Sequence, residues 1–403
     1  MTTTHTNFAR SRFNWLAALA LAWPVLGLAQ TAPTIKVGAI GPLSGSTADA
    51  GTEMLRGIQI AVEEFNRVGG YLGRHIELVV KDDESAPAAG VRESEALLQQ
   101  GTVATIGFCN TGVALKAIPL FQKAQQPLIV PCSAGTPVTT QFPAPDSYIF
   151  RNSARDAIQA PFVVNDLIRR GWTRVAILAD TTGYGEAGLK DVVAALKSHG
   201  LEPAYVGRFP TGVTDLSKQL GEARATGANA IFTYTVGPEN AVIANGRSAM
   251  KWDVPIVGGW ALSFPFFLEG APQASEGTLV AQSFIAEPSN ERRASFLANY
   301  ARKFNQRMKV PMAAAQGYDA AYLLMYALLS IRDGKFSGPA IKAALENPRR
   351  TYYGVIATYE RPFSPNDKDA LTEDMLVMGK VRGGKITFAY PEDARRNLFV
   401  RRK

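Results

Sequence analysis

One stretch decides the fold of this chain: Ile35-Lys36-Val37-Gly38-Ala39-Ile40, followed by Gly41-Pro42-Leu43-Ser44-Gly45. An apolar strand ends here in a turn of small residues. Residues 52–67 then keep an apolar period of 3.6 residues, which predicts a helix. Three more short apolar runs are expected to form strands, with helical stretches between them: 76–81, 103–107 and 128–130. This alternation predicts a parallel sheet covered by helices on both faces.

The same pattern restarts after a polar break at 151–156. A helix is expected over 159–169, and four apolar runs are expected to be strands: 174–180, 203–206, 230–233 and 255–257. The sequence therefore predicts an α/β protein with two doubly wound parallel-sheet lobes.

No third full set begins after residue 276. One strand, two long helices and a β-rich C-terminus remain, at 278–284, 294–306, 313–331 and beyond. These segments are expected to complete the existing lobes, so the chain crosses between the lobes more than once and forms a hinge. The predicted division assigns 34–152 plus 282–353 to lobe 1, and 153–281 plus 354–403 to lobe 2.

Composition excludes several classes of protein. The chain has 403 residues, of which 46% are hydrophobic and 19% charged, with a formal net charge of +8. These values exclude a disordered chain, a collagen, a disulfide-rich miniprotein and a polytopic membrane protein. The basic residues are scattered, so no nucleic-acid partner is expected. The exception is a C-terminal cluster, interpreted as a solvated tail or as a docking site for an acidic partner or a membrane: Arg395, Arg396, Arg401, Arg402 and Lys403.

The N-terminus predicts export. Arg10 and Arg12 precede an apolar run over 15–29 that ends in Gly27-Leu28-Ala29. The run is shorter than the roughly twenty residues that span a bilayer. Its charged, apolar and small-residue regions predict a cleaved signal peptide over residues 1–29 and a periplasmic mature protein.

The residues used for catalysis or metal binding are scarce. Only three histidines and two cysteines are present, and His75 and His199 stand beside turn glycines. No metal, cofactor or catalytic residue is therefore expected. The acidic run 82–84 ends a strand and is interpreted as a helix cap or a hinge contact.

Gly183-Tyr184-Gly185-Glu186-Ala187-Gly188 matches the dinucleotide-binding pattern. Because the ring of Tyr184 stands where the backbone approaches a pyrophosphate, an exported NAD(P)-dependent enzyme is only a minor alternative.

The predicted strands end in small, polar residues. In lobe 1 these ends are 44–45, 109–112 and 132–136, and in lobe 2 they are 181–185, 236–239 and 258–260. Ligands of open parallel sheets bind at the carboxyl ends of the strands, where helix N-termini present free N–H groups. The sequence thus predicts a small-molecule site between two lobes.

The chain resembles, over nearly its whole predicted mature length, the periplasmic substrate-binding proteins of branched-chain amino acid type ABC transporters. The resemblance rests on residues in this order: 37–45, 66–70, 73–78, Asp82-Asp83, Tyr184-Gly185 and Tyr318-Asp319-Ala320. It implies a type I periplasmic-binding-protein fold with three crossovers, a monomer that closes on its ligand and docks on a membrane permease, and no enzymatic activity. A sensory receptor of the same fold is the main alternative.

The resemblance also implies site residues. The family holds a ligand carboxylate with the loops after the third and fourth strands, which here contain Asn110, Thr111, Ser133, Ala134 and Thr136. Tyr184 corresponds to the family's aromatic lid on the second lobe.

The sequence departs from the family at the ammonium site. The amino-acid binders place a carboxylate where this chain has Gly258-Gly259-Trp260-Ala261-Leu262. An unpaired ammonium in a closed cleft costs several kcal/mol. The hypothesis is a carboxylate ligand without an α-ammonium, aromatic and stacked on Trp260 and Tyr184. Residues 107–114 and 362–365 resemble the family's aromatic-acid-binding branch. Glu239, one loop earlier, as the partner of an ammonium remains the alternative.

Cys109 and Cys132 follow strands that are adjacent in the expected sheet order. Two states remain open. Either they form a disulfide, or they are two reduced buried thiols, because the family's usual partner position is Ser85 here.

Overall fold

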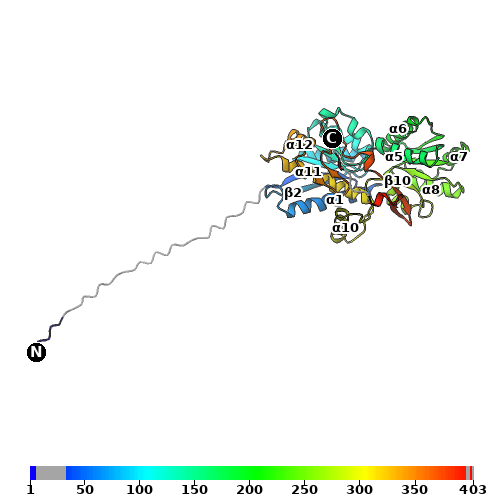
Figure 1. Ribbon diagram of the computed structural model, residues 1–403. Coiled ribbons are helices and arrows are strands. Elements are labelled where there is room, and N and C mark those ends of the chain that lie inside the picture. The colour runs from blue at the N-terminus through cyan, green and yellow to red at the C-terminus, as the bar shows by residue number, and fades with distance from the viewer. Residues whose placement is uncertain (6–32, 396–399, 402–403) are drawn as a thin grey trace. The chain divides into compact units, whose positions relative to one another are not determined.

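The computed structural model describes residues 1–5, 33–395 and 400–401. Residues 33–403 form one unit, and Figure 1 shows α1, α11 and α12 grouped in one lobe and α5 to α8 in the other. The predicted signal peptide lies outside the described residues, apart from residues 1–5. Most of the basic C-terminal cluster lies outside them as well.

The first lobe is built on a five-stranded sheet with the order β2-β1-β3-β4-β5. All of its neighbouring strands are parallel. The strands are β1 (Ile35–Gly41), β2 (Ile76–Asp82), β3 (Ala104–Gly107), β4 (Leu128–Val130) and β5 (Ile149–Arg151). The connecting helices are α1 (Ala48–Arg67), α2 (Pro87–Gln99), α3 (Thr111–Lys123) and the short α4 (Pro137–Thr140).

The second lobe is built on a seven-stranded sheet with the order β14-β13-β10-β9-β8-β6-β7. Its parallel strands are β6 (Val175–Asp180), β7 (Tyr205–Phe209), β8 (Ala230–Tyr234), β9 (Ile256–Gly258) and β10 (Leu279–Gln282). An antiparallel hairpin completes the edge, formed by β13 (Val377–Arg382) and β14 (Lys385–Phe388). The helical segments are α5 (Asp156–Arg169), α6 (Gly183–Ser198), α7 (Ser217–Ala225), α8 (Glu239–Ala249), the 3₁₀ turn η2 (Trp260–Ser263) and α9 (Pro265–Leu268).

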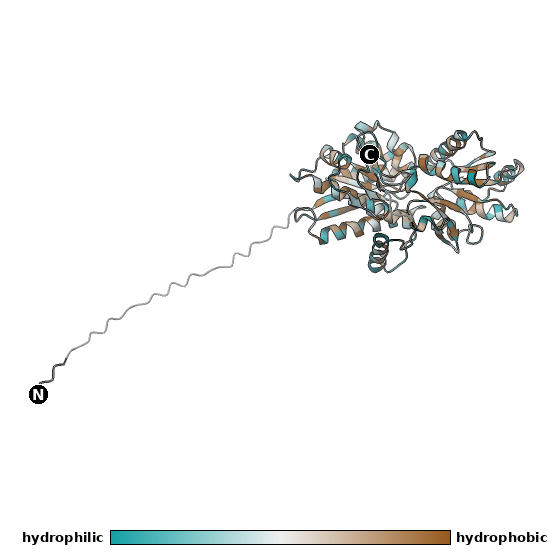
Figure 2. Cartoon of the chain, in the orientation of Figure 1, coloured by the Kyte–Doolittle hydropathy of each residue, from teal (hydrophilic) through white to brown (hydrophobic). Residues whose placement is uncertain are grey.

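Helices from the C-terminal third return to the first lobe. They are α10 (Glu291–Phe304), α11 (Pro311–Ser330) and α12 (Gly338–Glu346). The backbones of α1 and α11 approach closely, because a Cβ atom on Gly57 would lie only 1.9 Å from the carbonyl oxygen of Ala314. Since neighbouring elements cover α11, it is apolar on nearly every side. Figure 2 shows the hydrophobic residues, in brown, concentrated in the elements packed inside each lobe.

The expected α/β architecture of two lobes with parallel sheets is confirmed. The first two crossovers follow β5 and β10. After β11 (Tyr352–Tyr353) and β12 (Thr358–Tyr359), which pairs with β15 (Val400–Arg401), the chain still packs on the first lobe. Phe363 contacts Phe150 with ring centroids 5.0 Å apart. We therefore propose that the last crossover lies at 371–376 rather than at residue 354.

Candidate ligand-binding site between the lobes

A small cavity, called here the inner cavity, is enclosed between the carboxyl ends of the two sheets. Its volume is about 10 Å³, the space that one water molecule needs. The first lobe contributes Thr47, Cys109 and Ala134, and the second contributes Tyr184, Val236, Trp260, Ala261 and Phe264. None of these lining residues, all of which the structure describes, carries a charge. The inner cavity is therefore uncharged and is formed by both lobes.

A wider space of about 520 Å³, called here the outer opening, adjoins the inner cavity at Val236. First-turn residues of α3 (Gly112), α6 (Gly183) and α8 (Glu239) line it. Helix N-termini present unpaired N–H groups and a partial positive charge. The helix N-termini therefore favour an anionic group in the outer opening, whereas the Glu239 carboxylate disfavours one close to α8.

Asn110 lies in the loop after β3 and lines the outer opening. It is the N-cap residue of α3, but its side chain makes no capping hydrogen bond. The side chain is 8% exposed. A buried amide without a capping role is available to a ligand placed at the start of α3.

Thr111 and Ser133, two further residues of the predicted site, lie behind the wall of the site. Their hydroxyl oxygens are 3.0 Å apart, and both residues are buried. The Gly135 N–H donates to Oγ1 of Thr111 at 3.2 Å. These contacts join the loop after β3 to the loop after β4, so the two residues shape the site without lining either space.

Thr136 lies at a contact between the lobes. Its hydroxyl donates to Oδ2 of Asp191 in α6 at 2.7 Å. The same hydroxyl accepts a hydrogen bond from the N–H of Ala157 in α5 at 3.0 Å. Thr136 therefore ties its loop to two helices of the second lobe and is absent from the lining of both spaces.

Trp260 and Tyr184 both line the inner cavity, as does Ala134. Trp260 packs edge-on against Phe264 with ring centroids 4.9 Å apart. Tyr184 is in the first turn of α6, whose N-cap Thr182 accepts hydrogen bonds from the N–H groups of Tyr184 and Gly185. Together these rings give the second-lobe wall an aromatic character.

Glu239 lines the outer opening rather than the inner cavity. Its side chain is buried, and Oε1 accepts a hydrogen bond from the N–H of Gly212 at 2.5 Å. The other oxygen lies 3.4 Å from the hydroxyl of Thr235, which donates to it. Glu239 is thus already engaged in holding the 211–212 loop.

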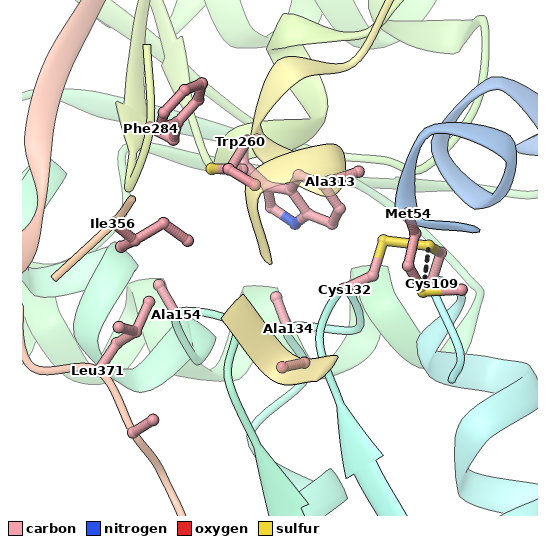
Figure 3. Close-up of a cluster of buried hydrophobic side chains, with 14 of the residues drawn as sticks. Met54, Cys109, Cys132, Ala134, Ala154, Trp260, Phe284, Ala313, Ile356 and Leu371 are labelled. Atoms are coloured by element: carbon pink, nitrogen blue, oxygen red, sulfur yellow. Dashed lines mark hydrogen bonds between the residues drawn. A yellow bond between two sulfur atoms is a disulfide. The ribbon is translucent and has the colours of Figure 1, made fainter. Parts of the chain in front are cut away.

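Cys109 and Cys132 form a disulfide in this structure. The bridge connects the residues that follow β3 and β4, and Cys109 lies in the wall of the inner cavity. Figure 3 shows the bridge, Met54, Ala134 and Trp260 in one buried cluster. The loops after β3 and β4, both in the first lobe, are therefore covalently joined.

Sequence reasoning missed a buried polar group behind Trp260. Asp156 begins α5, is fully buried and accepts a hydrogen bond from the Tyr234 hydroxyl at 3.1 Å. Gln159, one turn later, accepts the N–H of Trp260 at 3.2 Å. Burial raises the pKa of Asp156 to about 8, and the negative charge of Asp191 adds to this effect. The pattern Asp-x-x-Gln at the start of a helix was the available signal, and it was taken as part of the polar break.

A separate groove of about 560 Å³ is lined by the segment after β10, by α10, by the start of α11 and by β14. Phe284, Tyr300, Lys309 and Lys385 are among its lining residues. No predicted site residue lines it. The site defined by the inner cavity and the outer opening fits the location of ligands in open parallel sheets.

The described residues contain no helix with the length and apolar character needed to cross a membrane. Within the same residues, no group of three or more metal-binding side chains occurs.

The two lobes and the site between them define a class of protein. A family model described as periplasmic binding protein matches residues 34–385, and the chain belongs to that family. Its members are periplasmic proteins that bind solutes and catalyse no reaction. The resemblance found in the sequence is thereby confirmed.

Individual proteins are similar to this chain over most of its length. The Leu/Ile/Val-binding protein homolog 3 of Brucella melitensis is 25% identical over 267 residues, which are 66% of this chain and 71% of the relative. The branched-chain amino acid transporter substrate-binding protein LivJ of Streptococcus pneumoniae, solved with isoleucine, is 25% identical with a TM-score of 0.77, covering 88% of this chain and 97% of that chain.

A solute-binding protein of an ABC transporter from R. palustris, solved with 4-hydroxybenzoate, has the same fold. It is 21% identical with a TM-score of 0.74, covering 88% of this chain and 95% of that chain.

Proposed function

We propose that this protein is the solute-binding component of an ABC importer, and that it captures a small aromatic or apolar carboxylic acid that lacks an α-ammonium group. Similar structures hold isoleucine in one case and 4-hydroxybenzoate in another. The fold therefore leaves both ligand classes open, and the residues of this site must decide between them.

The observation that carries the proposal is Trp260 in an uncharged lining. An ammonium group placed against this wall loses its hydration and meets no carboxylate, which costs several kcal/mol. A micromolar site needs only about 8 kcal/mol of binding free energy in total. An aromatic ring, in contrast, gains contact with Trp260 and Phe264 at no such cost.

The two nearby acids do not supply the missing partner. Glu239 lies in the outer opening and already accepts the N–H of Gly212. Asp156 is fully buried behind Tyr234, and its raised pKa of about 8 makes the neutral acid the dominant form at pH 7. A neutral carboxyl group does not balance an ammonium charge.

The carboxylate of the ligand is assigned to the N-terminus of α3. Asn110 and Gly112 line the outer opening there. Free N–H groups and the helix dipole favour an anion at this position. The ring of the ligand then extends toward Trp260, and closure of the lobes removes both ends from water.

The wider biological role follows from the same proposal. The signal peptide over 1–29 exports the protein, the closed monomer docks on a membrane permease, and opening delivers the acid. No chemical step on the ligand is part of this cycle.

Calorimetric titration of purified mature protein tests the ligand class. The protein is first unfolded and refolded to remove any ligand retained from the host, and is then titrated with benzoate, cinnamate and leucine. Micromolar binding of an aromatic acid without binding of leucine is expected. Tight binding of leucine would show that the site accommodates an ammonium after all and would overturn the proposed class.

A further inference from the structure

A buried arginine lies beneath the loop that follows β4, and the ligand-binding account above does not use it. Arg151 ends β5 and has no exposed surface. Its Nη1 donates to the carbonyl oxygens of Ala134 and Gly135 at 3.0 and 2.8 Å. Its Nη2 donates to the hydroxyl of Thr139 at 2.7 Å. One guanidinium group therefore holds both ends of a short turn of the chain.

The charge of Arg151 is balanced by a residue far away in the sequence. Its Nε donates to Oδ1 of Asp369 at 2.6 Å. Asp369 reaches this place because the C-terminal segment runs alongside β5: the N–H of Arg151 donates to the Lys368 carbonyl, and the N–H of Ala370 donates to the Arg151 carbonyl, both at 2.8 Å. The main-chain pairing of residues 368–370 with β5 therefore brings the two charged side chains together.

This arrangement fixes the direction of two N–H groups. In a planar trans peptide the C=O and the following N–H point in opposite directions. Because Arg151 binds the carbonyls of Ala134 and Gly135, the N–H groups of Gly135 and Thr136 point away from it. The Gly135 N–H reaches Oγ1 of Thr111, in the first turn of α3. The Gly135 N–H is therefore directed to the start of α3, where it holds the Thr111 hydroxyl.

We infer that Arg151 is a positioning residue for ligand binding: it holds residues 134–135 so that the Gly135 N–H fixes the Thr111 hydroxyl in the first turn of α3, where the ligand carboxylate is placed. The inference rests on the proposed function in one respect, that the ligand carries a carboxylate. Both ligand classes discussed above share this group. Asp369 acts on the loop only through Arg151, which it orients and whose charge it balances.

Lysine does not reproduce this role. The guanidinium group is planar and donates in three directions at once, here to a carboxylate, to two carbonyls and to a hydroxyl. A lysine ammonium has the same charge but only three donors on one atom. Arg151→Lys therefore keeps the positive charge and loses the geometry that orients the loop.

The test compares acids with their neutral amides. Wild type and Arg151→Lys are titrated by calorimetry with benzoate and benzamide, and in parallel with leucine and leucinamide. For the pair whose acid binds wild type, we expect the acid to bind at least roughly tenfold more tightly than the amide. Arg151→Lys is expected to lose most of that ratio while its affinity for the amide stays unchanged.

A second buried arginine provides the control. Arg293 in α10 is 8% exposed and donates to the Val355 carbonyl at 3.2 Å and to the Ser289 hydroxyl at 3.1 Å. Arg293→Lys is expected to lower the melting temperature and to leave the ratio of acid to amide affinity intact. If Arg151→Lys does not fold, Thr139→Val removes one acceptor of the guanidinium group and one donor to Asp369, and is expected to reduce the same ratio.

Several outcomes would overturn the inference. These are an unchanged ratio in the Arg151 and Thr139 variants, a parallel loss of affinity for acid and amide, and a wild-type protein with no preference for the acid. Preference for leucine over leucinamide without any binding of benzoate would refute the proposed ligand class. It would leave Arg151 to be tested on the leucine pair.

Discussion

Gly112 and Gly183 meet across the two lobes. A Cβ atom on Gly183 would lie 3.2 Å from Cα and 3.4 Å from the backbone nitrogen of Gly112. Gly112 is in the first turn of α3, and Gly183 begins α6. The two helix N-termini therefore approach to backbone contact when the lobes are together, and no side chain larger than hydrogen fits between them without displacement.

Gly183→Val should hold the lobes apart. Because the added side chain meets the backbone of α3, we expect ligand affinity to fall by about tenfold or more, which corresponds to roughly 1.4 kcal/mol. Calorimetry gives the affinity, and small-angle scattering shows whether the ligand still compacts the protein. Gly221→Val in α7, where a Cβ atom meets nothing within 4 Å, is the matched control. Unchanged affinity in both variants would contradict the closure mechanism.

Trp260→Glu should change the class of ligand. The substitution removes the aromatic wall and places a carboxylate in the lining of the inner cavity. We expect benzoate affinity to fall by about tenfold or more, and leucine binding to appear because its ammonium gains a partner. Calorimetry measures the loss of benzoate affinity and the gain of leucine affinity.

Trp260→Gln is the control for that substitution, since it has the same length without the charge. It should lose benzoate and gain no leucine binding. Benzoate affinity that survives both substitutions would show that the ring does not stack on Trp260.

Asp156 should make the protein less stable as the pH rises. Its pKa is about 8 in the folded protein because of burial, well above the value of 3.8 for a free side chain. The folded state therefore holds a proton that the unfolded state releases, and stability falls as pH rises from about 4 to 8. Asp83, with a pKa raised to about 7 by burial, acts in the same direction.

Asp156→Asn removes this titration and keeps an acceptor for the Tyr234 hydroxyl. Urea unfolding at pH 5, 7 and 9 should show a smaller loss of stability with pH in the variant than in the wild type. The loss of stability between pH 5 and pH 9 is expected to be about 4 kcal/mol smaller in the variant, since pH 5 lies about three units below the folded pKa of about 8. Identical slopes would mean that Asp156 is charged in the folded protein.

Replacing Cys109 and Cys132 by serine should affect both stability and binding. The bridge spans 23 residues of sequence, so its loss is expected to cost about 3 kcal/mol of unfolding free energy. Because the bridge joins the loops after β3 and β4, ligand affinity should fall as well. Denaturant unfolding and calorimetry measure the two effects. Loss of stability with unchanged affinity would assign the bridge a purely structural role.

The sequence predicted those features that depend on local pattern. The apolar strands and their small polar ends gave both lobes, and the helix expected at 52–67 begins at Ala48 in the structure. Thr136 shows the limit of this approach. The family resemblance implied a ligand contact at Thr136, whereas its hydroxyl donates in this structure to Asp191, which is 55 residues away and on the other lobe. A threonine looks the same in the sequence whether its hydroxyl donates to a ligand or to a residue of the other lobe.

Two other features depended on tertiary contacts. The role of Arg151 could not be predicted, because Asp369 is 218 residues distant and is brought near by pairing of the C-terminal segment. The proposed position of the last crossover depends on the same kind of contact, since nothing local in the sequence shows that Phe363 packs on Phe150.

The position of Asp369 has a consequence for the order in which the protein is completed. During synthesis the whole of the first sheet emerges before residue 369 does. Until then Arg151 lacks its hydrogen-bonded acidic partner, and a buried ion pair with one member missing is strongly unfavourable. The loop after β4 therefore reaches its final conformation only when the last tenth of the chain is present. A C-terminally truncated chain without Asp369 therefore lacks the ion pair that holds this loop, together with the β13–β14 edge of the second sheet.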